Sequence, residues 1–182
     1  MHRERERLAD GRGVFIRPIR AADAPLLVDA FGHLSPLSRY RRFFTPMNRL
    51  SPTSVRYLTH VDHHRHEAVV AIDDHGSLVG IARYICSADD PTAAELAVTV
   101  IDDWQSDGLG TRLVERLVRR AREEGVERFT GEVLWENRKM LSLLRNLGVD
   151  RIVPVGSGAE EFSLRLDDPP GVTERVGGEK HG

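Results

Sequence analysis

The sequence predicts a single domain of the α/β (α+β) class, in which helices cover a mixed sheet. Two observations support this: short β-branched and apolar runs recur along the chain, and amphipathic helical patterns lie among them. A length of 182 residues suits one compact domain, which we place at residues 13–166. Residues 1–12 are charged and aperiodic, and residues 167–182 contain clustered proline and glycine, so both are expected to be tails.

The sequence of the first half of the chain predicts groups of helices and groups of strands. Apolar residues from Leu26 to Leu34 recur at helical spacing. Ser35 and Ser51 each precede a proline, a pattern typical of helix starts. The strands expected in this half are residues 13–20, 67–73, 78–86 and 94–101, of which the second and third form a hairpin.

The second half contains the most clearly amphipathic helix, residues 111–124, which has apolar residues on one face and charges on the other. Gly125 ends this helix as a C-terminal cap would. The elements expected beyond it are strand 128–135, helix 137–147, and strands near 149–155 and 159–166.

Composition limits the classes of function. Hydrophobic residues make up 40% and charged residues 30%, which is typical of a globular protein. No apolar run approaches the roughly 18 residues of a membrane span, and the N-terminus lacks the apolar stretch of a signal peptide. A formal net charge of −2 provides no field to attract nucleic acid. The single cysteine, Cys86, cannot form an internal disulfide, so we expect a cytoplasmic protein without membrane or nucleic-acid partners.

The segment after strand 94–101 has the pattern of a phosphate-binding loop. It leads through Gly108 and Gly110 into a helix N-terminus, where unpaired N–H groups and the helix dipole favour an anion. No lysine precedes Thr111, so the loop is not the GxxxxGK[ST] nucleotide loop, and it lacks the third glycine of a dinucleotide fingerprint. Taken alone, the two glycines favour a tight turn with a glycine for packing over a phosphate site.

Two motifs resemble the GNAT superfamily of N-acetyltransferases. The run Gln105–Gly110 (QSDGLG) is similar to the [Arg/Gln]-x-x-Gly-x-[Gly/Ala] pyrophosphate motif of that family. The run Glu136–Gly148 (ENRKMLSLLRNLG) is similar to its Glu-Asn-x-x-(Ala/Met)…Leu-Gly helix. The resemblance spans about residues 13–166. It implies a mixed, mostly antiparallel seven-stranded sheet whose fourth and fifth strands splay apart, with the pantetheine of acetyl-CoA in the gap.

The resemblance also implies which residues hold acetyl-CoA. The backbone of Val98, Thr99 and Val100 would bond pantetheine, and the Val98 N–H would polarise the thioester carbonyl. Asn137 would lie near the thiol arm, although asparagine there also suits a helix N-cap. The amides expected to hold the pyrophosphate are those of Gln105, Ser106, Asp107, Gly108, Leu109, Gly110 and Thr111.

Glu95 is the candidate general base, because the run Ala94–Leu96 (AEL) resembles the frame of the base in the protein-lysine-acetylating branch. A lysine amine with a pKa of about 10.4 is cationic at pH 7, and removing its proton costs about 4.6 kcal/mol at about 1.36 kcal/mol per pKa unit. A carboxylate accepts that proton directly or through water. The alternative to a catalytic role is that Glu95 is only a solvated charge at the end of a strand. Leu144 stands where many relatives carry a tyrosine acid, so that acid is missing or replaced by water.

The stretch Leu34–Phe44 (LSPLSRYRRFF) is similar to a stretch of bacterial Pat-type protein acetyltransferase domains that borders the acceptor site. Its aromatic residues Tyr40, Phe43 and Phe44 are expected to pack in the core. The resemblance implies a protein lysine as the acceptor, with an acyl-CoA synthetase as one candidate. The arginines that would complement an acidic acceptor surface are Arg39, Arg41, Arg42 and Arg49.

Other interpretations stay open at this point. The acceptor can instead be a small amine, or the domain can be a non-catalytic acyl-CoA sensor, although the presence of Glu95 argues against a sensor. The histidines between His60 and His66 lack a cysteine partner and recognisable zinc-site spacing, so we expect a polar loop there and no metal site.

Overall fold

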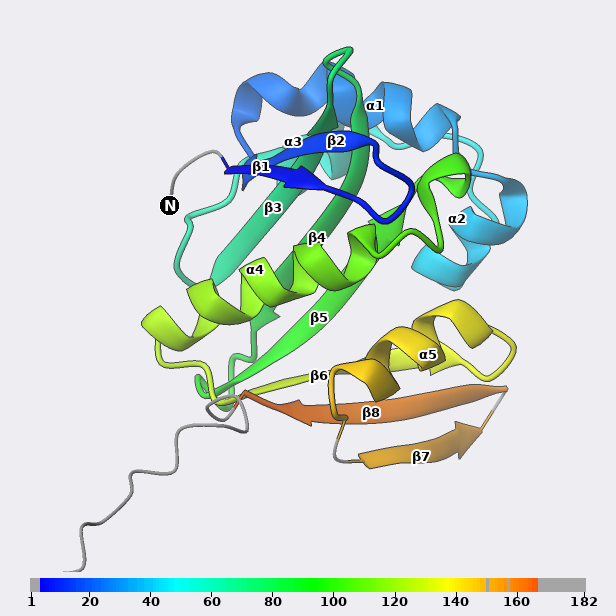
Figure 1. Cartoon of the computed structure of the whole chain (residues 1–182). Coiled ribbons are helices and arrows are strands. Elements are labelled where there is room, and N and C mark those ends of the chain that lie inside the picture. Colours follow the sequence, from blue (N-terminus) through cyan, green and yellow to red (C-terminus); the bar gives the residue numbers. More distant parts are fainter. Residues whose placement is uncertain (1–3, 150, 157, 167–182) are drawn as a thin grey trace, which may run out of the picture.

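The computed structural model describes residues 4–149, 151–156 and 158–166. Its centre is a sheet in the order β1-β2-β3-β4-β5-β6-β8-β7 (Figure 1). Among the described strands, β5 and β6 pair in parallel and every other neighbouring pair is antiparallel. This confirms the expected mixed, mostly antiparallel sheet. The strands are β1 (Glu4–Arg7), β2 (Gly13–Pro18), β3 (His66–Asp73), β4 (Leu78–Cys86), β5 (Ala93–Val100), β6 (Arg128–Leu134), β7 (Arg151–Gly156) and β8 (Ala159–Arg165).

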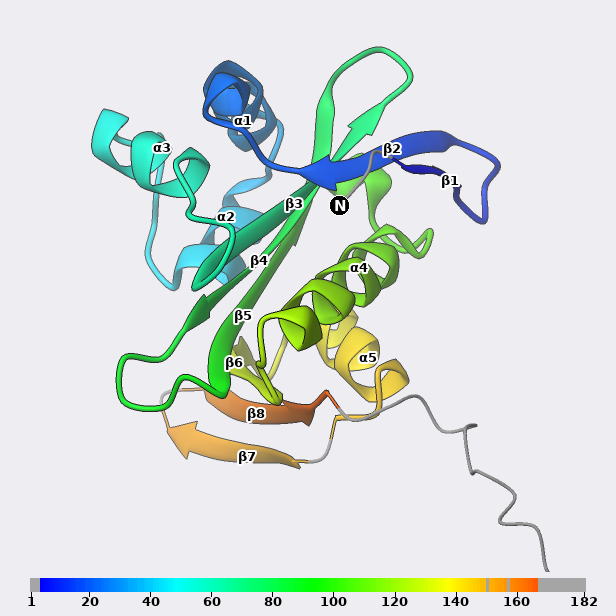
Figure 2. The same cartoon turned by 90° about the vertical axis from the view of Figure 1, so that its left-hand side faces the viewer.

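Helices cover both faces of the sheet, with α1, α2 and α3 on one side and α4 and α5 on the other (Figure 2). Ser35 and Ser51 begin two of them as predicted, since each hydroxyl accepts a hydrogen bond from the N–H three residues later. None of the described helices is long and apolar enough to cross a membrane. The helices are α1 (Ala24–Gly32), α2 (Pro36–Phe43), α3 (Pro52–Thr59), α4 (Leu109–Glu123) and α5 (Arg138–Asn146).

The N-terminal segment corrects two expectations. Residues 4–7 pair with β2 and add an eighth strand to the expected seven, and Leu8 is only 6% exposed. The expected tail at residues 1–12 is therefore wrong for this part. An edge strand needs only backbone pairing and tolerates charged side chains, which hide it from hydropathy patterns. Here Arg5 reaches Asp74 at 3.3 Å across the sheet. The expected tail at residues 167–182 lies outside the described residues.

Two apolar clusters hold the helices against the sheet. The larger lies under α4 and α5 and takes in Leu96 of β5 and Leu113 and Leu117 of α4. The smaller lies on the opposite face, where Leu27 of α1 packs with Ile81 of β4. Successive residues of β5 point to opposite faces, so Glu95 points away from α4 while Leu96 points toward it.

The family resemblance implied that the fourth and fifth of seven strands splay apart. With the additional strand β1 counted, these two strands are β5 and β6. Their backbone pairing covers only the register from Ala93↔Arg128 to Glu95↔Thr130. Beyond Glu95 the two strands diverge (Figure 1), and α5 follows β6 on the far side of the opening. From Leu96 to Val100 this edge of β5 therefore has no strand beside it among the described residues. The backbone groups that point away from β4 are left for a ligand, except the Val100 carbonyl, which accepts a hydrogen bond from Gln105 Nε2 at 3.0 Å.

Candidate active site

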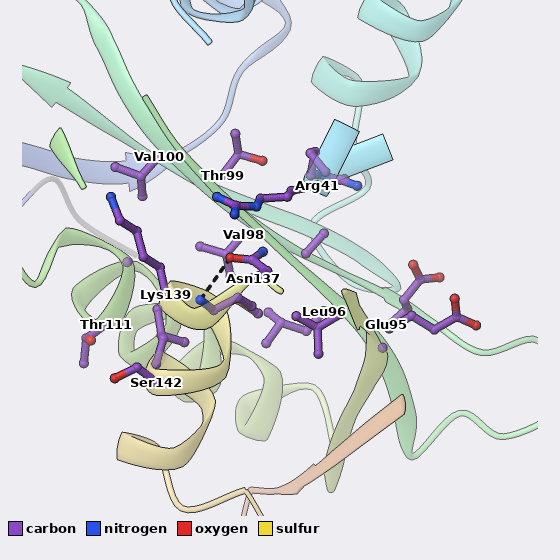
Figure 3. A pocket seen from close by; sticks show the side chains of 18 of the residues that line it. Arg41, Glu95, Leu96, Val98, Thr99, Val100, Thr111, Asn137, Lys139 and Ser142 are labelled. Atoms are coloured by element: carbon purple, nitrogen blue, oxygen red, sulfur yellow. Dashed lines mark hydrogen bonds between the residues drawn. The ribbon is translucent and has the colours of Figure 1, made fainter. Parts of the chain in front are cut away.

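The opening between β5 and β6 widens into a cleft of about 1100 Å³. Its walls come from β5, the loop before α4, β6, α5 and helix α2. Figure 3 shows Glu95 at one end, Thr111 and Lys139 at the other, and Val98 and Asn137 between them. The cleft therefore follows β5 along its free edge.

Most of the predicted site residues line this cleft, but two do not. The Asp107 carboxylate pairs with Arg12 at 3.0 Å, and Leu109 is a core residue that is 1% exposed. A role for these two residues in binding is confined to their backbone groups. The predicted residues that line the cleft are Glu95, Val98, Thr99, Val100, Gln105, Ser106, Gly108, Gly110, Thr111 and Asn137.

The loop before α4 presents a helix N-terminus to the cleft. Ser106 and Gly108 both have left-handed backbone, with φ values of 78° and 84°. No side chain within the described part of the chain caps α4. The N–H groups of residues 109–111 precede the first intrahelical bond, which runs from the Arg112 N–H to the Gly108 carbonyl at 3.1 Å. Uncapped N–H groups at the positive end of a 15-residue helix are suited to binding an anion.

Gly110 allows close packing between α4 and α5. A Cβ on this residue would lie 2.8 Å from Leu143 Cδ1, closer than side-chain carbons approach one another. The first turn of α4 can therefore lie close to Leu143 of α5 at the wall of the cleft.

Lys139 lies in the cleft, although sequence reasoning missed it. Its Nζ donates to Gln105 Oε1 at 2.9 Å, while Gln105 Nε2 donates to the Val100 carbonyl at 3.0 Å. These bonds place an ammonium group beside the anion-binding loop. The chain has only two lysines, Lys139 and Lys180, so the rarity of lysine was an available signal. The helical pattern alone did not show that this position faces the loop.

Asn137 is an N-cap, as one of its two interpretations predicted, and it also faces the cleft. Its Oδ1 accepts a hydrogen bond from the Met140 N–H at 3.3 Å (Figure 3), so it is the N-cap of α5. It also lines the cleft between the anion-binding end and Glu95.

Glu95 is an exposed carboxylate at the other end of the cleft. Helix α2 brings two arginines to this part of the wall. Arg41 reaches the Glu136 carbonyl at 3.5 Å, and its Nε is buried without a hydrogen-bond partner among the described residues. Burial lowers the pKa of the Arg42 guanidinium, and the negative charge of Glu95 partly offsets that effect. Arg42 and Glu95 are therefore electrostatic neighbours.

The aromatic residues on and next to α2 correct another expectation. Tyr40 and Phe44 are 39% and 40% exposed, so the expected core packing is wrong for both. Phe43 is half-buried and lies 5.9 Å from Phe31 between ring centroids. The reason is that α2 lies beside the cleft and has no fully buried residue.

Three further residues that the sequence singled out do not line the cleft. Leu144, at the position of the family's tyrosine acid, is fully buried in the core and offers no proton. Two of the clustered histidines pair with carboxylates elsewhere: His63 with Glu67 at 2.7 Å and His64 with Glu124 at 2.9 Å. In the described part of the chain, no group of three or more histidine, cysteine, aspartate or glutamate side chains is placed to hold a metal ion.

Comparison with known proteins agrees with this geometry. A model of the acetyltransferase (GNAT) family matches residues 35–149. Acetyltransferase PA5475 of Pseudomonas aeruginosa is 35% identical over 146 residues, which cover 79% of this chain and 78% of that protein. Acetyltransferase Pat of Mycolicibacterium smegmatis is 30% identical over 139 residues, which cover 76% of this chain but only 41% of that protein.

A solved structure extends the similarity to three dimensions. The GNAT domain of S. lividans PAT superposes with a TM-score of 0.84 at 30% identity, covering 90% of this chain and 96% of that one. The splayed strands, the uncapped helix at the cleft and these similarities lead to one conclusion: the chain belongs to the acetyltransferase (GNAT) family and is an acyl-CoA-dependent N-acyltransferase with acetyl-CoA as its donor.

Proposed function

We propose that this protein transfers the acetyl group of acetyl-CoA to the side chain of a protein lysine, by direct attack of the amine with Glu95 as general base. One observation carries the proposal: a single cleft joins an anion-binding helix N-terminus to an exposed carboxylate along an unpaired strand edge. The donor and the acceptor then meet between these two ends.

The residues of the cleft suit the donor. Acetyl-CoA supplies the acetyl group as a thioester. The N–H groups from Ser106 to Thr111 bind its pyrophosphate, whereas the Gln105 N–H is bonded to the Asp102 carbonyl at 3.3 Å. The free edge from Val98 to Val100 pairs with the amides of its pantetheine arm. The Val98 N–H polarises the thioester carbonyl, where negative charge develops during attack.

Glu95 prepares the acceptor. Its carboxylate accepts the proton of the incoming ammonium group, directly or through water, so that a neutral amine attacks. Because Leu144 offers no proton, the departing thiolate takes its proton from water.

Three large apolar side chains on and next to α2 support a protein acceptor. Leu37, Tyr40 and Phe44 are 47%, 39% and 40% exposed beside the cleft. Arg41 and Arg42 line the cleft from the same helix. Exposed apolar and aromatic groups together with arginine are typical of surfaces that contact other proteins. The two relatives named Pat support the same branch.

The test is a turnover screen. Purified protein and acetyl-CoA are incubated with a cell lysate, with a purified acyl-CoA synthetase, and with polyamines and amino acids. Mass spectrometry reads lysine acetylation, and a thiol assay reads turnover. The same mixtures without the protein serve as the control for uncatalysed acetylation.

Acetylated lysines above that control support the proposal. If a small amine turns over briskly and no protein is acetylated, the acceptor is a small molecule and not a protein lysine. Tight CoA binding without any turnover would indicate a sensor.

Lys139 gives a prediction about the donor. Lys139→Met should weaken CoA binding about tenfold, because one charge-assisted hydrogen bond contributes about 1.5 kcal/mol and about 1.4 kcal/mol is tenfold in affinity. Arg145→Met is the matched control, since Arg145 lies on the same helix, is exposed and does not line the cleft. Calorimetry at low and high salt should show a loss for Lys139→Met that shrinks with salt. Equal affinity of the two variants would exclude Lys139 from the phosphate site.

A further inference from the structure

A single carboxylate joins helix α2 to the loop of the donor site. Asp102 follows β5 and accepts three hydrogen bonds from the start of α2. Its Oδ2 accepts from the Ser35 N–H at 3.0 Å, and its Oδ1 accepts from the hydroxyls of Ser35 at 2.9 Å and Ser38 at 2.8 Å. A second link is longer, from Gln105 Nε2 to Ser38 Oγ at 3.5 Å.

Apolar packing holds α2 only weakly. None of its eight residues is fully buried, and a helix of this length is not stable on its own. Arg39 donates to the carbonyls of Gly32 at 3.1 Å and Asn48 at 3.3 Å, which tie the helix to its neighbours in sequence. Asp102 and Gln105 tie it instead to the loop before α4, which is 67 residues away in sequence.

The carboxylate stays ionised over the neutral pH range. Burial opposes ionisation of Asp102, but the hydrogen bonds from Ser35 and Ser38 outweigh burial and hold the pKa of this carboxyl below its usual value. Negative charge at the N-terminus of α2 also complements the dipole of that helix.

Under the proposed function, the donor loop and helix α2, which these hydrogen bonds join, contact different substrates. Gln105 begins the loop that binds the pyrophosphate of the donor. Helix α2 carries Arg41 and Arg42, which line the cleft beside Glu95, where the acceptor amine arrives. A displacement of α2 would move these arginines without altering Glu95 or the loop itself.

We propose that Asp102 is a positioning residue that couples the two substrate sites: it holds α2 against the donor loop, so that donor binding orders the acceptor wall of the cleft. The inference rests on the proposed function, because it takes the Gln105–Thr111 loop as the donor site. Linkage requires the effect to be reciprocal, so a bound acceptor raises the affinity for CoA by the same factor.

The first experiment needs no acceptor. Hydrogen exchange of the amides of residues 36–43 is measured with and without CoA, in the wild type and in Asp102→Asn. Binding should slow exchange of α2 in the wild type, and the variant should lose that response while still binding CoA. Asp103→Asn is the matched control, since Asp103 is an exposed carboxylate on the same turn and makes none of the hydrogen bonds that join Asp102 to the start of α2. It should respond like the wild type.

The second experiment separates positioning from general stability. With whichever amine the enzyme turns over, Asp102→Asn should raise the acceptor KM about tenfold, the equivalent of one charge-assisted hydrogen bond, while kcat changes little. Ser38→Ala removes the same link from the side of α2 and should act alike. The double variant should be hardly worse than either single one, because both break one network.

The outcomes are distinct. If Asp102→Asn does not fold, Ser38→Ala alone carries both measurements. Wild-type protein that does not bind CoA would contradict the proposed function. Wild-type protein that binds CoA without any change in the exchange of α2, or an Asp102→Asn variant with wild-type exchange and KM, would contradict the coupling alone.

Discussion

Glu95→Gln should lower kcat by about 10²–10⁴-fold, the usual contribution of a positioned general base. Glutamine keeps the size and polarity of the side chain but cannot take the proton of the acceptor. Affinity for acetyl-CoA should be nearly unchanged, because Glu95 lies at the opposite end of the cleft from Thr111 and Lys139 (Figure 3). Steady-state kinetics together with calorimetry of CoA binding separate the two effects.

The pH dependence of the same variant adds a second readout. Without a base, only the fraction of acceptor that is already unprotonated reacts. For an amine with a pKa of about 10.4, that fraction grows about tenfold per pH unit between pH 6 and 9. The rate of Glu95→Gln should follow this slope, while the wild type rises less steeply, so the deficit narrows as pH rises.

Glu132 provides the control. It is exposed, lines the same cleft and lies on β6, two residues beyond the position paired with Glu95. Glu132→Gln should retain most of the wild-type turnover. If Glu132→Gln loses most of its turnover and Glu95→Gln loses little, the general base is Glu132 on β6. If both variants turn over like the wild type, Glu95 is a solvated charge at the end of a strand and not the general base.

The parts of this fold that local sequence determines were predictable. The apolar period of α4, the glycines before it and the caps at Ser35 and Ser51 all act within a few residues. Such signals place the strand, loop and helix that surround the donor end of the cleft. They do not reveal β1, whose pairing depends on a neighbouring edge and not on its own apolar residues.

The side chains that the sequence could not place depend on contacts between distant segments. Lys139 meets Gln105 across 34 residues, and Ser35 meets Asp102 across 67. Tyr40 looked like a core aromatic, because a helix pattern shows which residues share a face but not whether that face meets the sheet. Whether Tyr40 is buried depends on how α2 packs beside the cleft, which the local sequence does not show.

Gly108→Val is the most direct test of the donor end. Gly108 lines the cleft, has a φ of 84°, and a Cβ on it would have no atom within 4 Å. The Cβ of a valine there would point into open space, and the side chain would occupy part of the space where we place the pyrophosphate. Loss of two charge-assisted hydrogen bonds at about 1.5 kcal/mol each should weaken CoA binding roughly 100-fold.

Backbone strain must be separated from this effect, because a β-branched residue in left-handed backbone costs about 1–2 kcal/mol of stability wherever it is placed. Gly125→Val supplies the control: Gly125 has a φ of 79°, its Cβ would also have no atom within 4 Å, and it lies beyond the other end of α4, outside the cleft. Thermal unfolding should show similar destabilisation of the two variants, and calorimetry below both transitions should show weakened CoA binding only in Gly108→Val. If both variants bind CoA like the wild type, the phosphates do not lie on this loop.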